Sequence, residues 1–262
     1  MNNYEIKSCT VFSPIHSAQL PSSFRLDRRY VDIVNNANNC DFFPNGEANL
    51  LREFVENFAK QDCLIFDIGS NIGELTSYFL SLKPSVYINL FEPSRPTFEA
   101  LSCQSCPDTV TLNNFALGSR FEKLLLNIQG TSGTNPFLER SSLGIMQKQI
   151  AIISTLDHYC DSRSTYHIDF MKIEVEGFNL SVLRGAVGML FKGAIGMLQF
   201  EYRGTYLDAR IQLRDIWELL TSYGYSIVKV FPNSLKYIVR YSQSLESYKY
   251  TNWIATYSHV SG

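Results

Sequence analysis

The sequence lacks the features that would place it in a membrane or against a highly charged partner. The best candidate for an apolar span, GAVGMLFKGAIGML (residues 185–198), is interrupted by Lys192 and is too short to cross a bilayer. The first ten residues, MNNYEIKSCT, lack the apolar core of a secretory signal peptide, so we expect a cytoplasmic protein. A formal net charge of −2 gives no reason to expect nucleic acid or a membrane surface as a partner.

Cysteine and histidine are present, but they form neither a disulfide framework nor a metal site. The six cysteines are scattered, and only Cys103 and Cys106 form a C-x-x-C pair. A zinc site of this type needs a second pair of ligands, and none follows in the sequence. The four histidines show no metal-ligand spacing either. We therefore expect reduced cysteines and predict no bound metal.

Apolar strands alternate with helical segments over most of the 262 residues. Strands are predicted at 63–67, 86–92, 110–117, 169–177 and 194–202, and helices at 47–60, 75–82, 179–191 and 213–224. Residues 118–150 read as a hairpin followed by a Gly/Ser/Thr-rich loop. Such alternation predicts an α/β fold with a doubly wound, mostly parallel sheet. We expect an N-terminal cap (residues 1–46) and one domain (residues 47–262).

The segment FDIGSNIGELT (residues 66–76) joins a predicted strand to a helix and is typical of a ligand-binding turn. Gly69 and Gly73 allow a tight turn and close approach of a ligand to the backbone. A P-loop would need Gly-Lys-Ser/Thr here, and a dinucleotide-binding turn would need G-x-G-x-x-G. Neither pattern is present. The alternative without a ligand is a simple strand–helix turn.

Two acidic residues narrow the choice of ligand. Asp67 ends one predicted strand and suits a ligand that carries an ammonium group. Glu92 ends the next strand, where a carboxylate can accept hydrogen bonds from both hydroxyls of a ribose. Ammonium, ribose and adenine together describe S-adenosylmethionine, which we predict as the cofactor.

The segments FDIGSNIGELT, NLFEPSRPTFEAL, NNFALGS, STLDHYC, IDFMKIEVEGFNLSVLRGA and LQFEY resemble, in order and spacing, the FkbM-type methyltransferases. The resemblance covers about residues 45–257 and includes the closing segment up to YTNWIATY. It implies the class I methyltransferase fold, a Rossmann-like seven-stranded sheet whose last strand is antiparallel. It also implies S-adenosylmethionine as methyl donor and, as acceptor, a hydroxyl of a sugar or natural-product-like small molecule.

The resemblance also assigns binding residues. It implies that the methionine half of the donor is lined by Asp67, Gly69, Ser70, Asn71 and Gly73. Glu92 would hold the ribose, with Pro93 and Ser94 shaping its turn, and the adenine would lie beside Asn114, Phe115 and Ala116. The segment NGEANLL implies that Glu47 closes over the donor. This chain departs from the family at Glu174, where Asp is more common, and the longer side chain shifts the carboxylate by about 1.5 Å.

Charged residues in the segment DFMKIEVEG (residues 169–177) are the candidates for catalysis. Lys172, Glu174 and Glu176 alternate with apolar residues, so they would share one face of a strand. Glu174 or Glu176 would take the acceptor proton, Lys172 would balance their charge, and Glu201 is a third carboxylate nearby. Alternatively, Lys172 and Glu176 form a structural salt bridge, with Glu176 capping the following helix.

Acceptor recognition is expected from the N-terminal cap, residues 130–144 and the tyrosines near the end of the chain. These tyrosines are Tyr206, Tyr237, Tyr241 and Tyr248. We predict O-methylation of a small molecule; N-methylation by the same fold remains an alternative. Asp67 and the missing third glycine count against a nicotinamide-dependent oxidoreductase. Carboxylates at 174, 176 and 201 count against a scaffold that binds the donor without catalysis.

Overall fold

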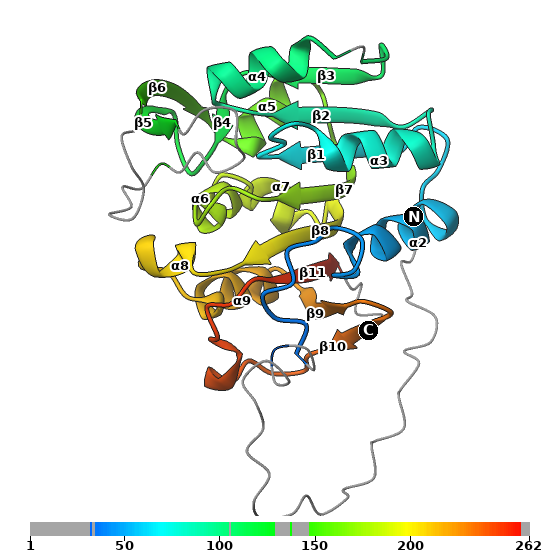
Figure 1. Ribbon diagram of the computed structural model, residues 1–262, viewed down its shortest axis with the longest axis vertical. Coiled ribbons are helices and arrows are strands. Elements are labelled where there is room, and N and C mark those ends of the chain that lie inside the picture. The colour runs from blue at the N-terminus through cyan, green and yellow to red at the C-terminus, as the bar shows by residue number, and fades with distance from the viewer. Residues whose placement is uncertain (1–31, 33–34, 105, 129–136, 138–146, 258–262) are drawn as a thin grey trace, which may run out of the picture.

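A mixed sheet of eight strands lies at the centre of the described part of the protein (Figure 1). The computed structural model describes residues 32, 35–104, 106–128, 137 and 147–257. Along the sheet the strands lie in the order β10-β9-β11-β8-β7-β1-β2-β3. Their bounds are β1 (Leu64–Ile68), β2 (Tyr87–Phe91), β3 (Val110–Asn113), β7 (Ile168–Ile173), β8 (Ile195–Tyr202), β9 (Tyr225–Phe231), β10 (Ser234–Tyr237) and β11 (Thr251–Tyr257).

The pairing confirms the predicted doubly wound fold. Strands β3, β2, β1, β7 and β8 pair in parallel, and β11 is antiparallel to both β8 and β9. The last strand is therefore antiparallel, as the resemblance implies. The sheet differs from the implied seven strands because β10 adds an eighth, antiparallel to β9 at the edge.

Helices cover both faces of the sheet, because its strands are apolar on both faces. On one face, Ile65 and Phe170 pack in one cluster with α2 (Glu47–Asn57), α3 (Glu74–Leu82) and α4 (Arg95–Ser102). On the other face, Phe66 and Met171 pack with α5 (Leu156–Ser162), α6 (Asn179–Arg184), α7 (Val187–Phe191) and α9 (Leu213–Ser222). Two short elements, α8 (Thr205–Asp208) and the 3₁₀ helix η1 (Gln243–Leu245), also contact this second cluster, through Tyr206 and Leu245.

A second, smaller sheet follows β3 and lies beside α4 and α5 (Figure 1). It contains β4 (Ala116–Leu117), β5 (Glu122–Ile128) and β6 (Gln147–Ser154). Strands β5 and β6 are antiparallel, so an antiparallel pair is present as predicted. Its two strands lie on either side of the Gly/Ser/Thr-rich segment, whereas the sequence placed the whole hairpin before that segment. The predicted strand at 110–117 is interrupted after Asn113, where the chain passes from one sheet to the other.

Some predictions lie outside the described residues. The structure describes little of the predicted cap (residues 1–46) before residue 35, and only Phe137 of the predicted recognition loop (residues 130–144). In the part of the chain that is described, no helix has the length and apolar character needed to span a bilayer.

Two predicted elements are shorter than expected. The helix predicted at 179–191 is broken into α6 and α7 at Gly185, where a Cβ atom would overlap the carbonyl oxygen of Gly118. The strand predicted at 169–177 ends at Ile173. Its partner β1 turns away after Ile68, and Glu176 (φ 50°) and Gly177 (φ 90°) adopt left-handed conformations that turn the chain. Glu174 and Glu176 therefore lie in a loop, and the prediction that they extend the strand face is wrong.

Candidate active site

The turn between β1 and α3 forms one wall of the site. Gly69 (φ 82°) and Gly73 (φ 80°) both adopt the left-handed conformation that favours glycine. A Cβ atom at Gly69 would overlap the carbonyl oxygen of Glu174, so this turn and the loop after β7 are in direct contact. Ser70 Oγ and Asn71 Oδ1 are buried and have no hydrogen-bond partner among the described residues. Buried polar atoms of this kind are available to a ligand.

The Glu92 carboxylate joins the ends of β1 and β2. Its Oε2 accepts a hydrogen bond from the Asn71 backbone N–H (3.0 Å), and its Oε1 accepts one from the Ser94 backbone N–H (2.8 Å). Burial raises the pKa of Glu92 to about 7, although the two N–H groups act to lower it. Each carboxylate oxygen keeps a second lone pair for a further donor.

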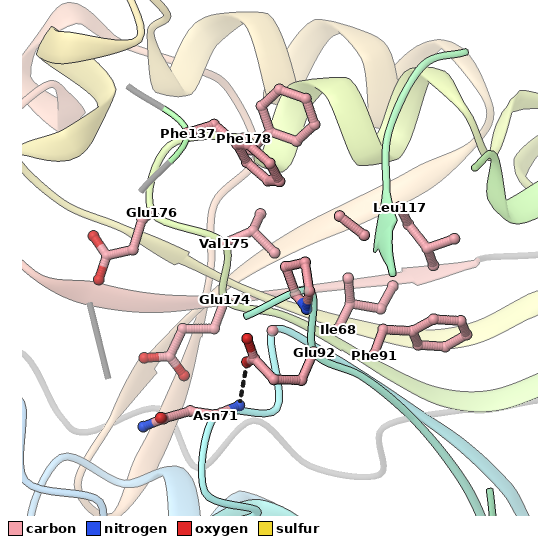
Figure 2. Close-up of a pocket in the computed structure, with 13 residues that line it drawn as sticks. Ile68, Asn71, Phe91, Glu92, Leu117, Phe137, Glu174, Val175, Glu176 and Phe178 are labelled. Atoms are coloured by element: carbon pink, nitrogen blue, oxygen red, sulfur yellow. Dashed lines mark hydrogen bonds between the residues drawn. The ribbon is translucent and has the colours of Figure 1, made fainter. Parts of the chain in front are cut away.

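A cavity of about 550 Å³, its open mouth included, lies between these two strand ends and the loop after β7. Figure 2 shows that the lining differs from side to side: the carboxylates of Glu174 and Glu176 point to one side, whereas Phe91 and Leu117 form the other. The full lining consists of Ile68, Gly69, Asn71, Phe91, Glu92, Pro93, Ala116, Leu117, Phe137, Glu174, Val175, Glu176 and Phe178. The cavity therefore suits a ligand with both an apolar ring and polar groups.

A row of polar side chains crosses three central strands behind this cavity. Asp67 of β1 pairs in register with Lys172 of β7, and Lys172 pairs with Gln199 of β8. Residues paired in this way point to the same face of a sheet. The Asp67 carboxylate accepts a hydrogen bond from Thr76 Oγ1 (3.1 Å). Burial raises the pKa of Asp67 to about 6, and the Lys172 ammonium acts in the opposite direction.

Lys172 is buried and is shared by two carboxylates. Its Nζ lies 2.6 Å from Glu47 Oε1 and 2.7 Å from Glu174 Oε2. Burial acts to lower the pKa of Lys172, but Glu174 and Glu47 outweigh it and raise that pKa well above its ordinary value. Burial likewise acts to raise the pKa of Glu174, but the Lys172 ammonium holds that pKa below its ordinary value. Glu174 is therefore ionised at neutral pH.

A second ion cluster lies next to the first. Arg203 Nη1 lies 3.0 Å from Glu176 Oε1 and 3.6 Å from Glu201 Oε2. Glu201 is 1% exposed, and neither carboxylate oxygen has a hydrogen-bond partner among the described residues. Burial, followed by the nearby charges of Glu174 and Glu176, raises the pKa of Glu201 well above its ordinary value. Glu176 is thus salt-bridged, although to Arg203 and not to Lys172 as the sequence suggested.

The predicted site residues divide into those that line the cavity and those that do not. The cavity wall contains Gly69, Asn71, Glu92, Pro93, Ala116, Glu174 and Glu176. Outside the lining lie Glu47, Asp67, Ser70, Gly73, Ser94, Asn114, Phe115, Lys172 and Glu201. Two of these support their neighbours: Asn114 Nδ2 donates to the Glu92 carbonyl oxygen (2.8 Å), and the Phe115 ring packs against those of Phe91 and Tyr159.

Three residues beside the site, Gln199, Arg203 and Asn252, were not predicted from the sequence. Gln199 had a local signal, because it lies two residues before Glu201 and therefore on the same face of a predicted strand. Arg203 directly follows the segment QFEY and could have been noticed there. Asn252, whose Nδ2 donates to Glu47 Oε2 (3.3 Å), has no local signal, because its position depends on how β11 pairs with β8.

Parts of the chain are similar to known methyltransferases. Residues 67–227, more than half of the chain, match a family model described as "Methyltransferase FkbM domain". The hexuronic acid methyltransferase AglP of Haloferax volcanii is 28% identical over 149 residues, or 55% of this chain and 58% of AglP. This match thus spans less than two thirds of AglP. The 2-O-methyltransferase NoeI of Sinorhizobium fredii is 23% identical over 210 residues, or 74% of this chain and 84% of NoeI.

One solved structure illustrates the structural likeness. The plantazolicin methyltransferase BpumL, in complex with a pentazolic desmethylPZN analog and SAH, is 10% identical to this chain with a TM-score of 0.48. The superposition covers 88% of this chain and 92% of that one. The family assignment rests on the family model that matches residues 67–227.

Proposed function

The chain belongs to the FkbM family of S-adenosylmethionine-dependent methyltransferases, and from that premise we propose that it methylates a hydroxyl group of a saccharide. The names of two relatives support different parts of this proposal: one is a hexuronic acid methyltransferase, which gives a saccharide as acceptor, and the other is a 2-O-methyltransferase, which gives transfer to oxygen. Because they are only 28% and 23% identical to this chain, the proposal names a class of acceptor and no particular sugar.

The residues around the cavity fit the methyl donor. Asn71 Oδ1, which has no hydrogen-bond partner among the described residues, lies in the lining and can accept a hydrogen bond from the donor, and Gly69 leaves room for close approach of the backbone. Glu92 has free lone pairs for ribose hydroxyls, and Leu117 lies on the apolar side that suits adenine. When bound, S-adenosylmethionine supplies a methyl group activated by a sulfonium charge.

The observation that carries the proposal is a carboxylate in the cavity wall, that of Glu174, which forms a salt bridge with the buried Lys172. A hydroxyl group must lose its proton to become a methyl ether, and a well-placed base adds about 10²- to 10⁴-fold to such a step. Glu174 lines the cavity, and Lys172 keeps its pKa low. As the acceptor oxygen bonds to the methyl carbon, the sulfur–methyl bond of the donor would break and its electron pair would stay on sulfur, which gives S-adenosylhomocysteine. The Glu174 carboxylate takes up the hydroxyl proton.

The other predicted catalytic residues have supporting roles in this scheme. Lys172 holds Glu174 in position and keeps it ionised. Glu176 lies on the same side of the cavity, but Arg203 pairs with its carboxylate, so it is the second candidate for the base. Glu201 lies off the cavity lining, and its raised pKa disfavours the ionised form that a base needs.

A methyl-transfer assay with labelled donor tests the proposed function. Purified protein is incubated with labelled S-adenosylmethionine and a panel of methyl glycosides, amines and carboxylic acids, and the products are separated by chromatography. We expect label on at least one glycoside, in an ether that resists mild base. Transfer to amines or carboxylates alone would overturn the proposed acceptor class, and failure to bind S-adenosylhomocysteine in calorimetry would overturn the proposed donor site.

The variant Glu174→Gln tests the proposed base. Glutamine keeps the size of the side chain but cannot accept the proton, so turnover should fall by about 100-fold or more while donor affinity changes little. Single-turnover methyl transfer and calorimetry with S-adenosylhomocysteine measure the two effects. The matched control is Glu218→Gln, the same change at an exposed residue of α9 that pairs with Arg214. A fully active Glu174→Gln enzyme would remove Glu174 from the mechanism and leave Glu176 as the next candidate.

A further inference from the structure

Glu47, the first residue of α2, reaches across three strands of the central sheet. Glu47 is 2% exposed, and its carboxylate lies 2.6 Å from Lys172 Nζ of β7. It also accepts hydrogen bonds from Gln199 Nε2 of β8 (2.8 Å) and Asn252 Nδ2 of β11 (3.3 Å). Since Glu47 is not part of the cavity lining, these contacts do not place it over the donor.

The contacts of Glu47 tie its charge to that of Glu174. Both carboxylates lie against the same buried ammonium, at 2.6 and 2.7 Å from Lys172 Nζ. One positive charge therefore faces two negative charges. Lys172 and Glu47 are buried, whereas the Glu174 side chain is 33% exposed, so the interaction between Lys172 and Glu47 is screened least. Each carboxylate offsets part of the attraction that Lys172 exerts on the other. Gln199 and Asn252 keep Glu47 fixed where it has this effect.

We propose that Glu47 is a positioning residue that sets the proton affinity of Glu174 through their shared contact with Lys172. Without the Glu47 charge, Lys172 would be neutralised by Glu174 alone, and Glu174 would become a weaker base. With it, the pair of carboxylates leaves a net negative charge beside the cavity, where a proton has to be accepted. This inference rests on the proposed role of Glu174, but its first test needs no acceptor.

Glu174 has several charged and titratable neighbours, and a substitution at Glu47 leaves the others unchanged. The charged and titratable groups around it are Lys172 on β7, Asp67 on β1, Glu47 on α2, Glu176 after β7, Glu201 on β8, Arg203 after β8, Tyr250 before β11 and Cys40 in the N-terminal segment. Among them, Glu47 shares with Glu174 a direct ion pair to Lys172. A substitution at Glu47 is therefore the most specific way to change the electrostatic interaction between Lys172 and Glu174.

Carboxyl NMR on protein labelled with ¹³C-glutamate measures the effect directly. The Glu174 signal is assigned by its absence in Glu174→Gln, and its pKa is followed in the wild type, Glu47→Asp and Glu47→Gln. We expect the pKa of Glu174 to fall by about one unit or more in Glu47→Gln, because a like charge a few ångströms away is removed. Glu47→Asp keeps the charge farther from Lys172 and should give a smaller fall. An unchanged pKa of Glu174 in both variants would overturn the proposal.

The control and a second readout separate tuning from a structural role. Glu56→Gln makes the same change at an exposed position of α2 and should leave the pKa of Glu174 unaltered. In the methyl-transfer assay, the acid limb of the pH–rate profile should move to lower pH in Glu47→Gln, with donor affinity unchanged. If Glu47→Gln does not fold, the graded effect of Glu47→Asp still decides. A lowered pKa of Glu174 without any shift of the acid limb would refute Glu174 as the base and leave the charge coupling standing.

Discussion

At the scale of single residues, Glu92 combines a structural and a binding role in one carboxylate. Its two oxygens accept hydrogen bonds from the backbone of Asn71 and of Ser94, so it joins the loops that follow β1 and β2. The same carboxylate lines the cavity. Because burial raises its pKa to about 7, its charge changes within the physiological pH range.

The variant Glu92→Gln should weaken donor binding. Loss of charge-assisted hydrogen bonds costs about 1.5–3 kcal/mol, which corresponds to a rise of about 10- to 150-fold in the dissociation constant of S-adenosylhomocysteine. In the wild type, affinity should also fall as the pH is lowered from 8 to 6, because Glu92 becomes protonated. The variant should lack that part of the pH dependence. Calorimetry at several pH values checks both effects, with the exposed Glu99→Gln as control.

At the scale of elements, the site depends on contact between two loops. The turn from β1 to α3 and the loop after β7 meet where Gly69 faces the carbonyl oxygen of Glu174. The Glu174 backbone N–H also donates to the Ile68 carbonyl oxygen (2.9 Å), which continues the β1–β7 pairing by one residue. The position of the proposed base is therefore set by the backbone of the donor-binding turn.

Gly69→Ala should disrupt this contact. A Cβ atom would overlap the Glu174 carbonyl, and the left-handed conformation at φ 82° is itself unfavourable for alanine. We expect a loss of about 1–3 kcal/mol in the free energy of unfolding and a larger loss of donor affinity. The control is Gly204→Ala, where φ is −56° and the nearest atom to a Cβ is 3.7 Å away. Equal thermal stability and equal S-adenosylhomocysteine affinity of the two variants would contradict the claim that the site depends on contact between these two loops.

At the scale of the whole molecule, the site makes the free enzyme less stable at neutral and alkaline pH. The pKa values of Asp67 and Glu92 in the folded protein, about 6 and about 7, exceed their ordinary values of 3.8 and 4.5. Between about pH 4 and pH 7 the folded state therefore binds more protons at these two carboxylates than the unfolded state does. The stability that these two groups contribute is present at about pH 4 and is lost as the pH rises to about 7.

Asp67→Asn should make the ligand-free protein more stable at pH 8. Asparagine can still accept the hydrogen bond from Thr76 but does not bury a charge, so the free energy of unfolding should rise by about 1–3 kcal/mol. The gain should shrink as the pH approaches 4, and donor affinity should fall. Thermal melting between pH 4 and pH 8, without ligand, checks the prediction. A variant less stable than the wild type at pH 8 would show that ionised Asp67 stabilises the fold.

The sequence by itself determined the layered fold and the donor-binding end of the site. Alternating apolar strands and amphipathic helices are local patterns, and they suffice for a parallel sheet with helices on both faces. The G-x-x-x-G turn and the acids at the ends of β1 and β2 could also be predicted to lie close together from the sequence, since parallel strands bring their carboxyl ends to one edge of a sheet. Asn71 and Glu92 indeed meet there through a hydrogen bond.

Only the tertiary structure decided how the charged groups pair and which of them are ionised. Lys172 meets Glu47 from a helix more than a hundred residues earlier, and Arg203 joins Glu176 to Glu201. Such pairs depend on strand register, on the end of β7 at Ile173 and on the packing of α2, which no local pattern contains. Burial and the charged partners then determine the pKa of each carboxylate, so the carboxylates differ from one another only in the folded protein.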